Sequence, residues 1–240
     1  MASDQVVLSV PGPAALHLST SSGRVTVTAE ERSDVLIESG APPADRIERD
    51  ATGRIRFASP KGGSANIELR CPFGSDVVVG TISGAVTLRG QLGALRVTTV
   101  SGNVSVESAE ELDVRSISGS IDVERASARC RLQTKSGHAV CNTAADAQVS
   151  TLSGRICLNA TTGKVHAQSV SGAVDVGTAA KGEVTVQTIS GSVHVAVPQG
   201  VRPSTRLRTI SGRPRVDCPP GEDCEIRVQS MSGKIEVVPD

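Results

Sequence analysis

Apolar and polar residues alternate along most of this chain, and the alternation changes phase at a recurring Ser-Gly dipeptide. Leu112 and Val114 lie seven and five positions before Gly119, whereas Ile121 and Val123 lie two and four positions after it. Because successive side chains of a strand point to opposite faces, each segment predicts a half-buried β-strand. A straight strand would move the apolar face outward at this point. The phase change therefore predicts a corner or bulge at Ser-Gly.

The Ser-Gly unit is an internal repeat. Successive glycines are separated by 18, 17, 18, 17, 18, 19, 21 and 21 residues, and Ser22-Gly23 fits the same template. Counted from each glycine, position −3 is always Ser or Thr, and positions −5, +2 and +4 are almost always apolar. The glycines that we predict to form structural corners are Gly84, Gly102, Gly119, Gly137, Gly154, Gly172, Gly191, Gly212 and Gly233.

Two architectures satisfy this repeat. One is a β-solenoid in which each repeat forms one coil, and the other is a meander of hairpins that turn at Ser-Gly. The near-constant length and the matching residue types in each column favour in-register stacking of coils. We therefore predict an all-β protein: a β-solenoid (parallel β-helix or roll) with coils of about 18 residues, Thr/Ser-x-Ser-Gly corners and an N-terminal β cap.

The repeat also predicts the organisation of the chain. Residues 1–75 follow the template only once, so they are predicted to form an N-terminal β segment that caps the solenoid. Residues 76–240 hold the solenoid repeats, in one continuous domain with the cap. The last repeat runs almost to Asp240, so we expect a thinly protected C-terminal edge at which Pro239 blocks strand addition.

Composition narrows the classes of partner. The formal net charge is zero, from 25 basic and 25 acidic residues, which disfavours a nucleic-acid or anionic membrane partner. Phe57 and Phe73 are the only aromatic residues, so stacking platforms for bases or sugars are not expected. No apolar run reaches the ~18 residues of a transmembrane helix, and no signal peptide is seen. We expect a cytoplasmic protein, surface-exposed only if an export signal was removed.

The repeated hydroxyls are the first candidates for chemistry. A catalytic serine needs a base within hydrogen-bond reach, but the four histidines occupy different positions in their repeats. We therefore predict that the Ser/Thr column forms a hydrogen-bonded ladder at the corner. In the outward +3 column, Asp122 and Asp175 are three coils apart, too far for a paired-carboxylate hydrolase. The sequence thus predicts no catalytic, cofactor-binding or metal site, and no enzyme.

Two local features remain outside the repeat columns. Cys218 and Cys224 bracket a short loop in the longest insertion and could close as a disulfide or stay reduced. A local excess of arginines could form a polyanion patch or contact an acidic partner. It consists of Arg202, Arg206, Arg208, Arg213 and Arg215.

The repeat resembles the bacterial putative-adhesin family with β-strand repeats, also called toastrack proteins. The resemblance rests on units such as Thr188-Ile-Ser-Gly-Ser-Val-His-Val195 and on the opening stretches LHLSTSSGRVTVTA and PPADRIERDATGRIRF. It covers essentially the whole chain and implies a repeat scaffold of unknown function rather than a reaction.

We therefore predict a non-enzymatic β-solenoid scaffold or protein-interaction module that binds a protein partner or self-associates through the ends or faces of the solenoid. Two alternatives stay open. One is a carbohydrate-binding or carbohydrate-active β-helix protein, which needs a groove of clustered acids, His or Arg. The other is a cytosolic β-helix that forms polymers.

Overall fold

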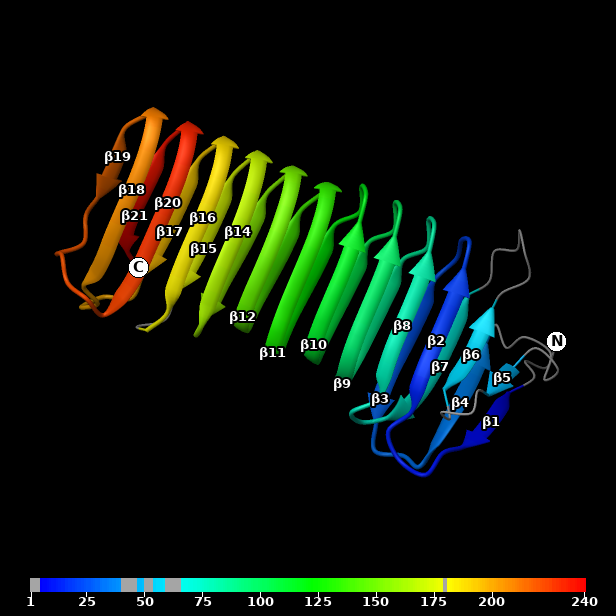
Figure 1. The fold of residues 1–240 in the computed structure, drawn as a ribbon. Coiled ribbons are helices and arrows are strands. Elements are labelled where there is room, and N and C mark those ends of the chain that lie inside the picture. Colours follow the sequence, from blue (N-terminus) through cyan, green and yellow to red (C-terminus); the bar gives the residue numbers. More distant parts are fainter. Residues whose placement is uncertain (1–4, 40–46, 50–53, 59–65, 179–180) are drawn as a thin grey trace. The chain divides into compact units, whose positions relative to one another are not determined.

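The computed structural model describes residues 5–39, 47–49, 54–58, 66–178 and 181–240, and every regular element in them is a β-strand (Figure 1). The chain divides into two compact units, Met1–Ser120 and Ile121–Asp240, which are described separately below. In the described residues there is no helix with the length and hydropathy needed to cross a membrane.

The described residues of the first unit form ten strands. They are β1 (Val6–Ser9), β2 (Ala15–Thr20), β3 (Val25–Glu30), β4 (Asp34–Ser39), β5 (Ile47–Arg49), β6 (Ile55–Ala58), β7 (Ile67–Pro72), β8 (Asp76–Thr81), β9 (Val86–Thr99) and β10 (Val104–Ser116). The second unit, without residues 179–180, forms eleven strands. They are β11 (Ile121–Ser136), β12 (Ala139–Ser153), β13 (Ile156–Thr161), β14 (Lys164–Ser171), β15 (Val174–Thr178), β16 (Glu183–Ser190), β17 (Val193–Val197), β18 (Pro203–Ser211), β19 (Pro214–Val216), β20 (Cys224–Ser232) and β21 (Ile235–Pro239).

Neighbouring coils pair in parallel and in register. Val165 of β14 lies opposite Val184 of β16, which lies opposite Ile226 of β20, so residues of one repeat column stack on each other. Hairpins would have paired antiparallel strands. The predicted β-solenoid is therefore confirmed, and the meander of hairpins is excluded.

The core consists of the inward columns on both sides of each corner. Val174 and Val176 of β15 and Val184 and Val186 of β16 are at most 2% exposed. β-branched side chains suit this narrow interior because they pack well on a pleated surface. Phe57, in the first unit, is the only aromatic residue in the described core.

In the first unit, the coil around Gly23 stacks on a coil that is far from it in the sequence. β2 pairs with β8, and β3 pairs with β9, so the Ser22-Gly23 repeat lies directly beside the Gly84 repeat. On their other sides β2 and β3 pair with β6 and β7, and the antiparallel strands β4, β1 and β5 follow. The assignment of residues 1–75 as a cap stays a prediction, and its segments 1–4, 40–46, 50–53 and 59–65 lie outside the described residues.

In the second unit, the order of the last coils differs from their order in the sequence. β20 pairs with β16 on one side and β18 on the other, and β21 likewise lies between β17 and β19 (Figure 1). The expected edge is therefore wrong for Ile235–Val237, which pair with both β17 and β19, whereas Pro239 pairs only with Val197 and is exposed. The coil of β18 and β19, residues 202–216, forms the edge instead, and we call it the edge coil.

Candidate interaction surfaces

The corners of the first unit hold their Ser/Thr hydroxyls by hydrogen bonds within one coil. The N–H groups of Gly84 and Gly102 each donate to the hydroxyl three residues earlier, Thr81 and Thr99, at 3.0 Å. The N–H of Gly119 donates in the same way to Ser116, at 2.8 Å. These hydroxyls are buried and face the backbone, so they cap the corner rather than face a substrate.

The corners of the second unit are built differently. The N–H groups of Gly154, Gly172, Gly191 and Gly233 donate to serine carbonyls of the neighbouring coil at 3.2–3.3 Å, and their φ angles lie between 139° and 156°. Several hydroxyl oxygens of the −3 column are buried and have no hydrogen-bond partner within the described part of the chain. They belong to Thr134, Thr151, Ser169, Thr188 and Thr209. The predicted ladder of hydroxyls bonded to one another is therefore not what these corners contain.

An exposed apolar side chain lies beside each of several corners, at position −2. In the second unit we call this set the apolar row, and in spatial order it consists of Leu152, Val170, Ile189, Met231 and Ile210. These side chains are 39–81% exposed. In the first unit, Ile82, Val100 and Ile117 occupy the same column and are 40–55% exposed.

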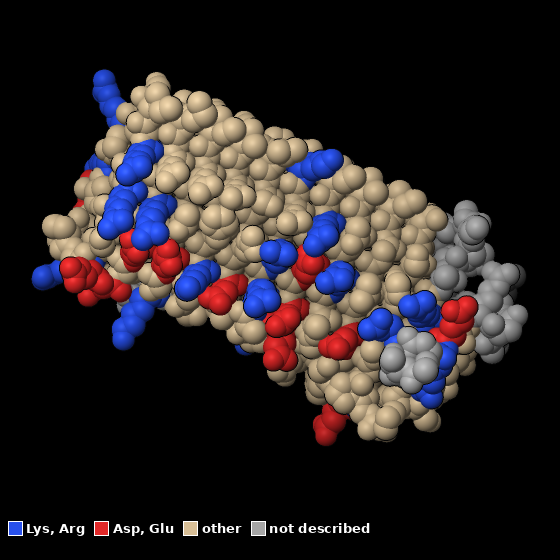
Figure 2. All heavy atoms as spheres, in the orientation of Figure 1, with Lys and Arg blue, Asp and Glu red and all other residues tan. Residues whose placement is uncertain are grey.

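Uncharged polar side chains border the apolar row. A groove of about 400 Å³ runs beside it, lined by Leu152, Val170 and Ile189 together with Ser150, Gln168 and Gln187. The Gln168 amide donates to the Gln187 amide oxygen at 3.3 Å. Figure 2 shows a largely uncharged stretch of surface over the ends of β14 and β16. The sequence already indicates this row. Positions −3 and −5 face inward, so position −2 faces outward, and yet its residues are mostly apolar.

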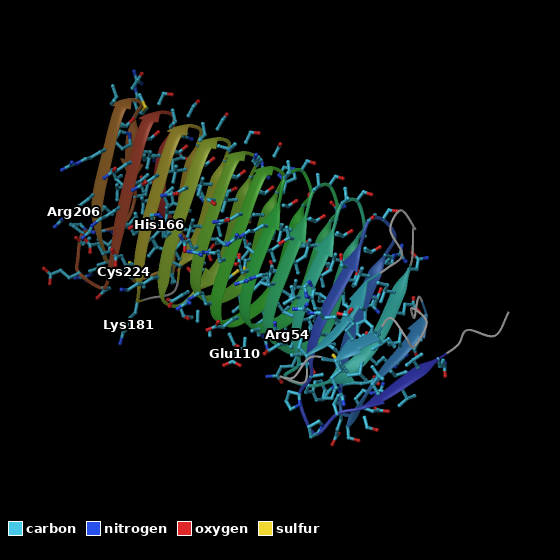
Figure 3. All side chains as sticks on the ribbon, turned by 45° about the vertical axis from the view of Figure 1, so that its right-hand side comes forward. Arg54, Glu110, His166, Lys181, Arg206 and Cys224 are labelled. Atoms are coloured by element: carbon cyan, nitrogen blue, oxygen red, sulfur yellow. The ribbon has the colours of Figure 1, made fainter. Side chains whose placement is uncertain are left out.

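A second groove in the same unit is charged. It has a volume of about 380 Å³ and is lined by Arg129, Asp146, Gln148, Lys164, His166, Glu183 and Thr185, with His166 marked in Figure 3. Its acids already have partners: Asp146 accepts a hydrogen bond from the N–H of Lys164 at 2.8 Å, and Glu183 lies 3.5 Å from Arg227. Basic and acidic side chains alternate along the groove, so their charges cancel. The groove therefore contains no free pair of carboxylates.

The new order of coils also changes the outward +3 column. His194 lies between Asp175 of β15 and Glu236 of β21, whereas the order in the sequence would place Arg215 next to it. Asp175 lies 3.8 Å from Arg155. The described residues contain no group of three or more His, Cys, Asp or Glu side chains that could hold a metal ion.

The pKa of most of the cysteines is raised, which suppresses thiolate formation, whereas the hydrogen bond from Cys130 lowers the pKa of Cys141. Cys130 and Cys141 lie in the core with their sulfurs 3.7 Å apart, and the hydrogen bond to Cys141, together with burial, raises the pKa of Cys130. Burial also raises the pKa of Cys71, to about 11. Cys218 and Cys224 are buried free thiols whose pKa values are raised mainly by burial. Their disulfide stays a prediction.

The five arginines of the predicted patch all lie on the edge coil and are exposed. Arg215 forms an ion pair with Asp217 at 2.8 Å, and that contact raises the pKa of Arg215. The side chains of Arg206, Arg208 and Arg213 have no ion pair with any described residue. Of the nearby acids, Glu225 binds Arg227 at 2.8 Å, and the Asp223 carboxylate accepts the backbone N–H of Arg202 at 2.8 Å. Figure 2 shows basic side chains gathered at the end of the second unit that β18 forms.

The edge coil is also the least covered part of the core of the second unit. Val216 is 40% exposed, and Leu207 and Thr205 are half-buried, although the corresponding residues of the neighbouring coil, such as Val228 and Ile226, are fully buried. Because no further coil stacks on β18 and β19 in the described chain, their inward side chains remain in contact with solvent.

Comparison with known proteins places these features in a family. A family profile described as Toastrack DUF4097 matches residues 16–238. A solved putative adhesin from Parabacteroides distasonis aligns with a TM-score of 0.57 at 11% identity, covering 97% of this chain and 95% of its own, so the two share a fold. A putative adhesin from Bacteroides fragilis aligns over 98% and 97% of the two chains at 12% identity, with a TM-score of 0.46. Among curated proteins there is no match.

Proposed function

The chain belongs to the Toastrack DUF4097 family. We propose that it is a non-enzymatic scaffold that associates with a second copy of itself through the apolar row. The observation that carries this proposal is the regular exposure of one apolar side chain per coil in the second unit, from Leu152 to Ile210. Exposed apolar patches that are rimmed by polar residues mark interaction sites on soluble proteins.

The spacing of the row supports a second copy as its occupant. Strands in one ladder are ~4.8 Å apart, so the apolar side chains recur at that interval. A second copy presents the same interval, so the side chains of two facing rows can interdigitate along their whole length. The five side chains of the row extend over four strand spacings, roughly 19 Å, so they form the apolar centre of an interface between two copies rather than its whole area.

The arrangement of polar groups supports a role without catalysis. A nucleophile needs a base within hydrogen-bond reach. The corner hydroxyls described above bond to the backbone or are enclosed in the core, and the acids of the charged groove are bound to basic or backbone groups. This support is independent of the apolar row.

Sedimentation velocity of the purified chain tests self-association. We expect a dimer at about 100 μM and a monomer for the double variant Val170→Ser/Ile189→Ser, because serine removes the apolar contact without changing charge. Phe73→Ser is the matched control, since Phe73 is 48% exposed but lies outside the row, in the first unit. A monomeric wild type at that concentration, or a double variant that still dimerises, would contradict the proposal.

A further inference from the structure

We propose that the edge coil binds an extended acidic peptide, which adds as a further strand along β18. This site does not depend on self-association, although Ile210 of β18 is also the last member of the apolar row. Three observations carry the inference: the open edge of β18, its arginines with no acid directly opposite them in the described sheet, and the partly uncovered core beneath it.

β18 has a free hydrogen-bonding edge beyond Pro203, whose carbonyl accepts the N–H of Gly221 at 3.3 Å. It pairs with β20 along Pro203–Ser211, and no strand of the described chain pairs with its other side. An edge strand presents unpaired N–H and C=O groups, which are a template for another strand. The other strand of the coil is a poorer template, because β19 has only three residues and begins at Pro214.

The sheet places no acid directly opposite Arg206 or Arg208 of β18. In the parallel register, Arg206 lies opposite Arg227, and Arg208 lies opposite Gln229. Arg227 is itself neutralised by Glu225 and Glu183, at 2.8 and 3.5 Å. Like charges opposite each other on a sheet are unfavourable. Acidic side chains that neutralise Arg206 and Arg208 can therefore come from the free side of β18, toward which Arg206 projects (Figure 3).

The alternation along β18 defines the pattern of the peptide. Side chains of an added strand would point alternately to the two faces, as those of β18 do. Every second residue would lie beside Arg206 and Arg208 and should be Asp or Glu. The residues between them would cover half-buried Thr205 and Leu207 and should be small or apolar. Two copies of β18 would oppose Arg to Arg, so this edge favours a partner of different sequence.

A fluorescently labelled, end-capped peptide that alternates Glu with Val and Thr is the probe. We expect saturable binding in anisotropy titrations that weakens as salt is raised. Arg206→Gln/Arg208→Gln should raise the Kd about tenfold, because two charge contacts are lost. Arg131→Gln is the matched control, since Arg131 occupies the same −6 column on an inner coil and is half-buried. Val170→Ser/Ile189→Ser should leave the Kd unchanged.

Hydrogen exchange identifies the mode of binding. If the peptide adds as a strand, the amides within residues 203–211 should exchange more slowly when it is bound. A patch that binds through charge alone would bind polyphosphate equally well and would not protect these amides. A charge-reversed protein, Arg206→Glu/Arg208→Glu, should lose the Glu peptide and bind its Lys counterpart. Failure to bind the Glu peptide at about 1 mM, equal binding of polyphosphate, or binding without amide protection overturns the proposal.

Discussion

Gly119 packs directly against the backbone of the neighbouring coil. A Cβ placed on it would overlap the carbonyl oxygen of Gly102, and the same relation joins Gly102 to Gly84. Gly119 does not have a positive φ, whereas Gly154 in the second unit has a φ of 153°. At Gly102 and Gly119, close approach of two backbones rather than an unusual backbone conformation therefore requires glycine.

Gly119→Ala should lower the free energy of unfolding by about 2–4 kcal/mol, because the overlapped atom belongs to the backbone and cannot move aside. Gly80→Ala is the control: no heavy atom lies within 4 Å of a Cβ at Gly80, and its φ is ordinary. That change should be neutral, or stabilise by up to about 1 kcal/mol through the unfolded chain. Urea denaturation of both variants measures the difference. Equal stabilities would contradict the packing of glycine against glycine.

The corner is the element in which the two units differ. In the first unit the N–H of Gly102 donates to Thr99 within the same corner. In the second unit the N–H of Gly154 donates to the carbonyl of Ser171 in the next coil, and the hydroxyl of Thr151 has no partner among the described residues. The same four-residue pattern therefore supports two hydrogen-bond arrangements.

Two Thr→Val substitutions separate these arrangements, because valine has nearly the shape of threonine. Thr99→Val should lower the free energy of unfolding by about 1–3 kcal/mol, since the buried N–H of Gly102 loses its acceptor. Thr151→Val should be neutral or stabilising, since it removes a buried hydroxyl oxygen without a partner. Chemical denaturation at one pH compares the two. A larger loss for Thr151→Val than for Thr99→Val would show that the two arrangements are assigned to the wrong units.

At the scale of the whole molecule, the order of coils in the second unit decides which backbone is open to solvent. β20 has a paired strand on both sides, whereas β18 has one on a single side. Only an edge strand offers unpaired backbone groups to a partner. The coil of β20 and β21 comes later in the sequence but lies between the edge coil and the rest of the unit. The five arginines of the edge coil therefore occupy an open edge.

Native hydrogen exchange tests this order without any substitution. Amides of residues 203–211 should exchange faster than those of residues 224–232, although the latter lie nearer the end of the sequence. The reason is that edge strands open locally at lower free-energy cost than strands paired on both sides. Measurement of peptide fragments by mass spectrometry would resolve both segments. Faster exchange in 224–232 would mean that the coils stack in the order of the sequence.

Much of the candidate surface could be predicted from residue types, but its partners could not. The sequence identifies five arginines from Arg202 to Arg215, and the structure leaves four of them, all but Arg215, without an ion pair among the described residues. Glu222, Asp223 and Glu225 are close in sequence and suggest neutralisation, yet Glu225 binds Arg227 and the Asp223 carboxylate accepts the N–H of Arg202. Proximity along the chain does not determine which strand a side chain lies beside.

The sequence by itself determined the coil: its length, its corner, and which side chains face inward. These properties follow from alternation along a strand and from the phase change at Ser-Gly, which are local and repeat in each unit. Only the tertiary structure decided the order of stacking, and with it the edge at β18 and the position of His194 between Asp175 and Glu236. The physical reason is that the inward columns are alike in every coil, so each coil fits any neighbour in register. The repeat therefore contains no information about which coil lies next to which.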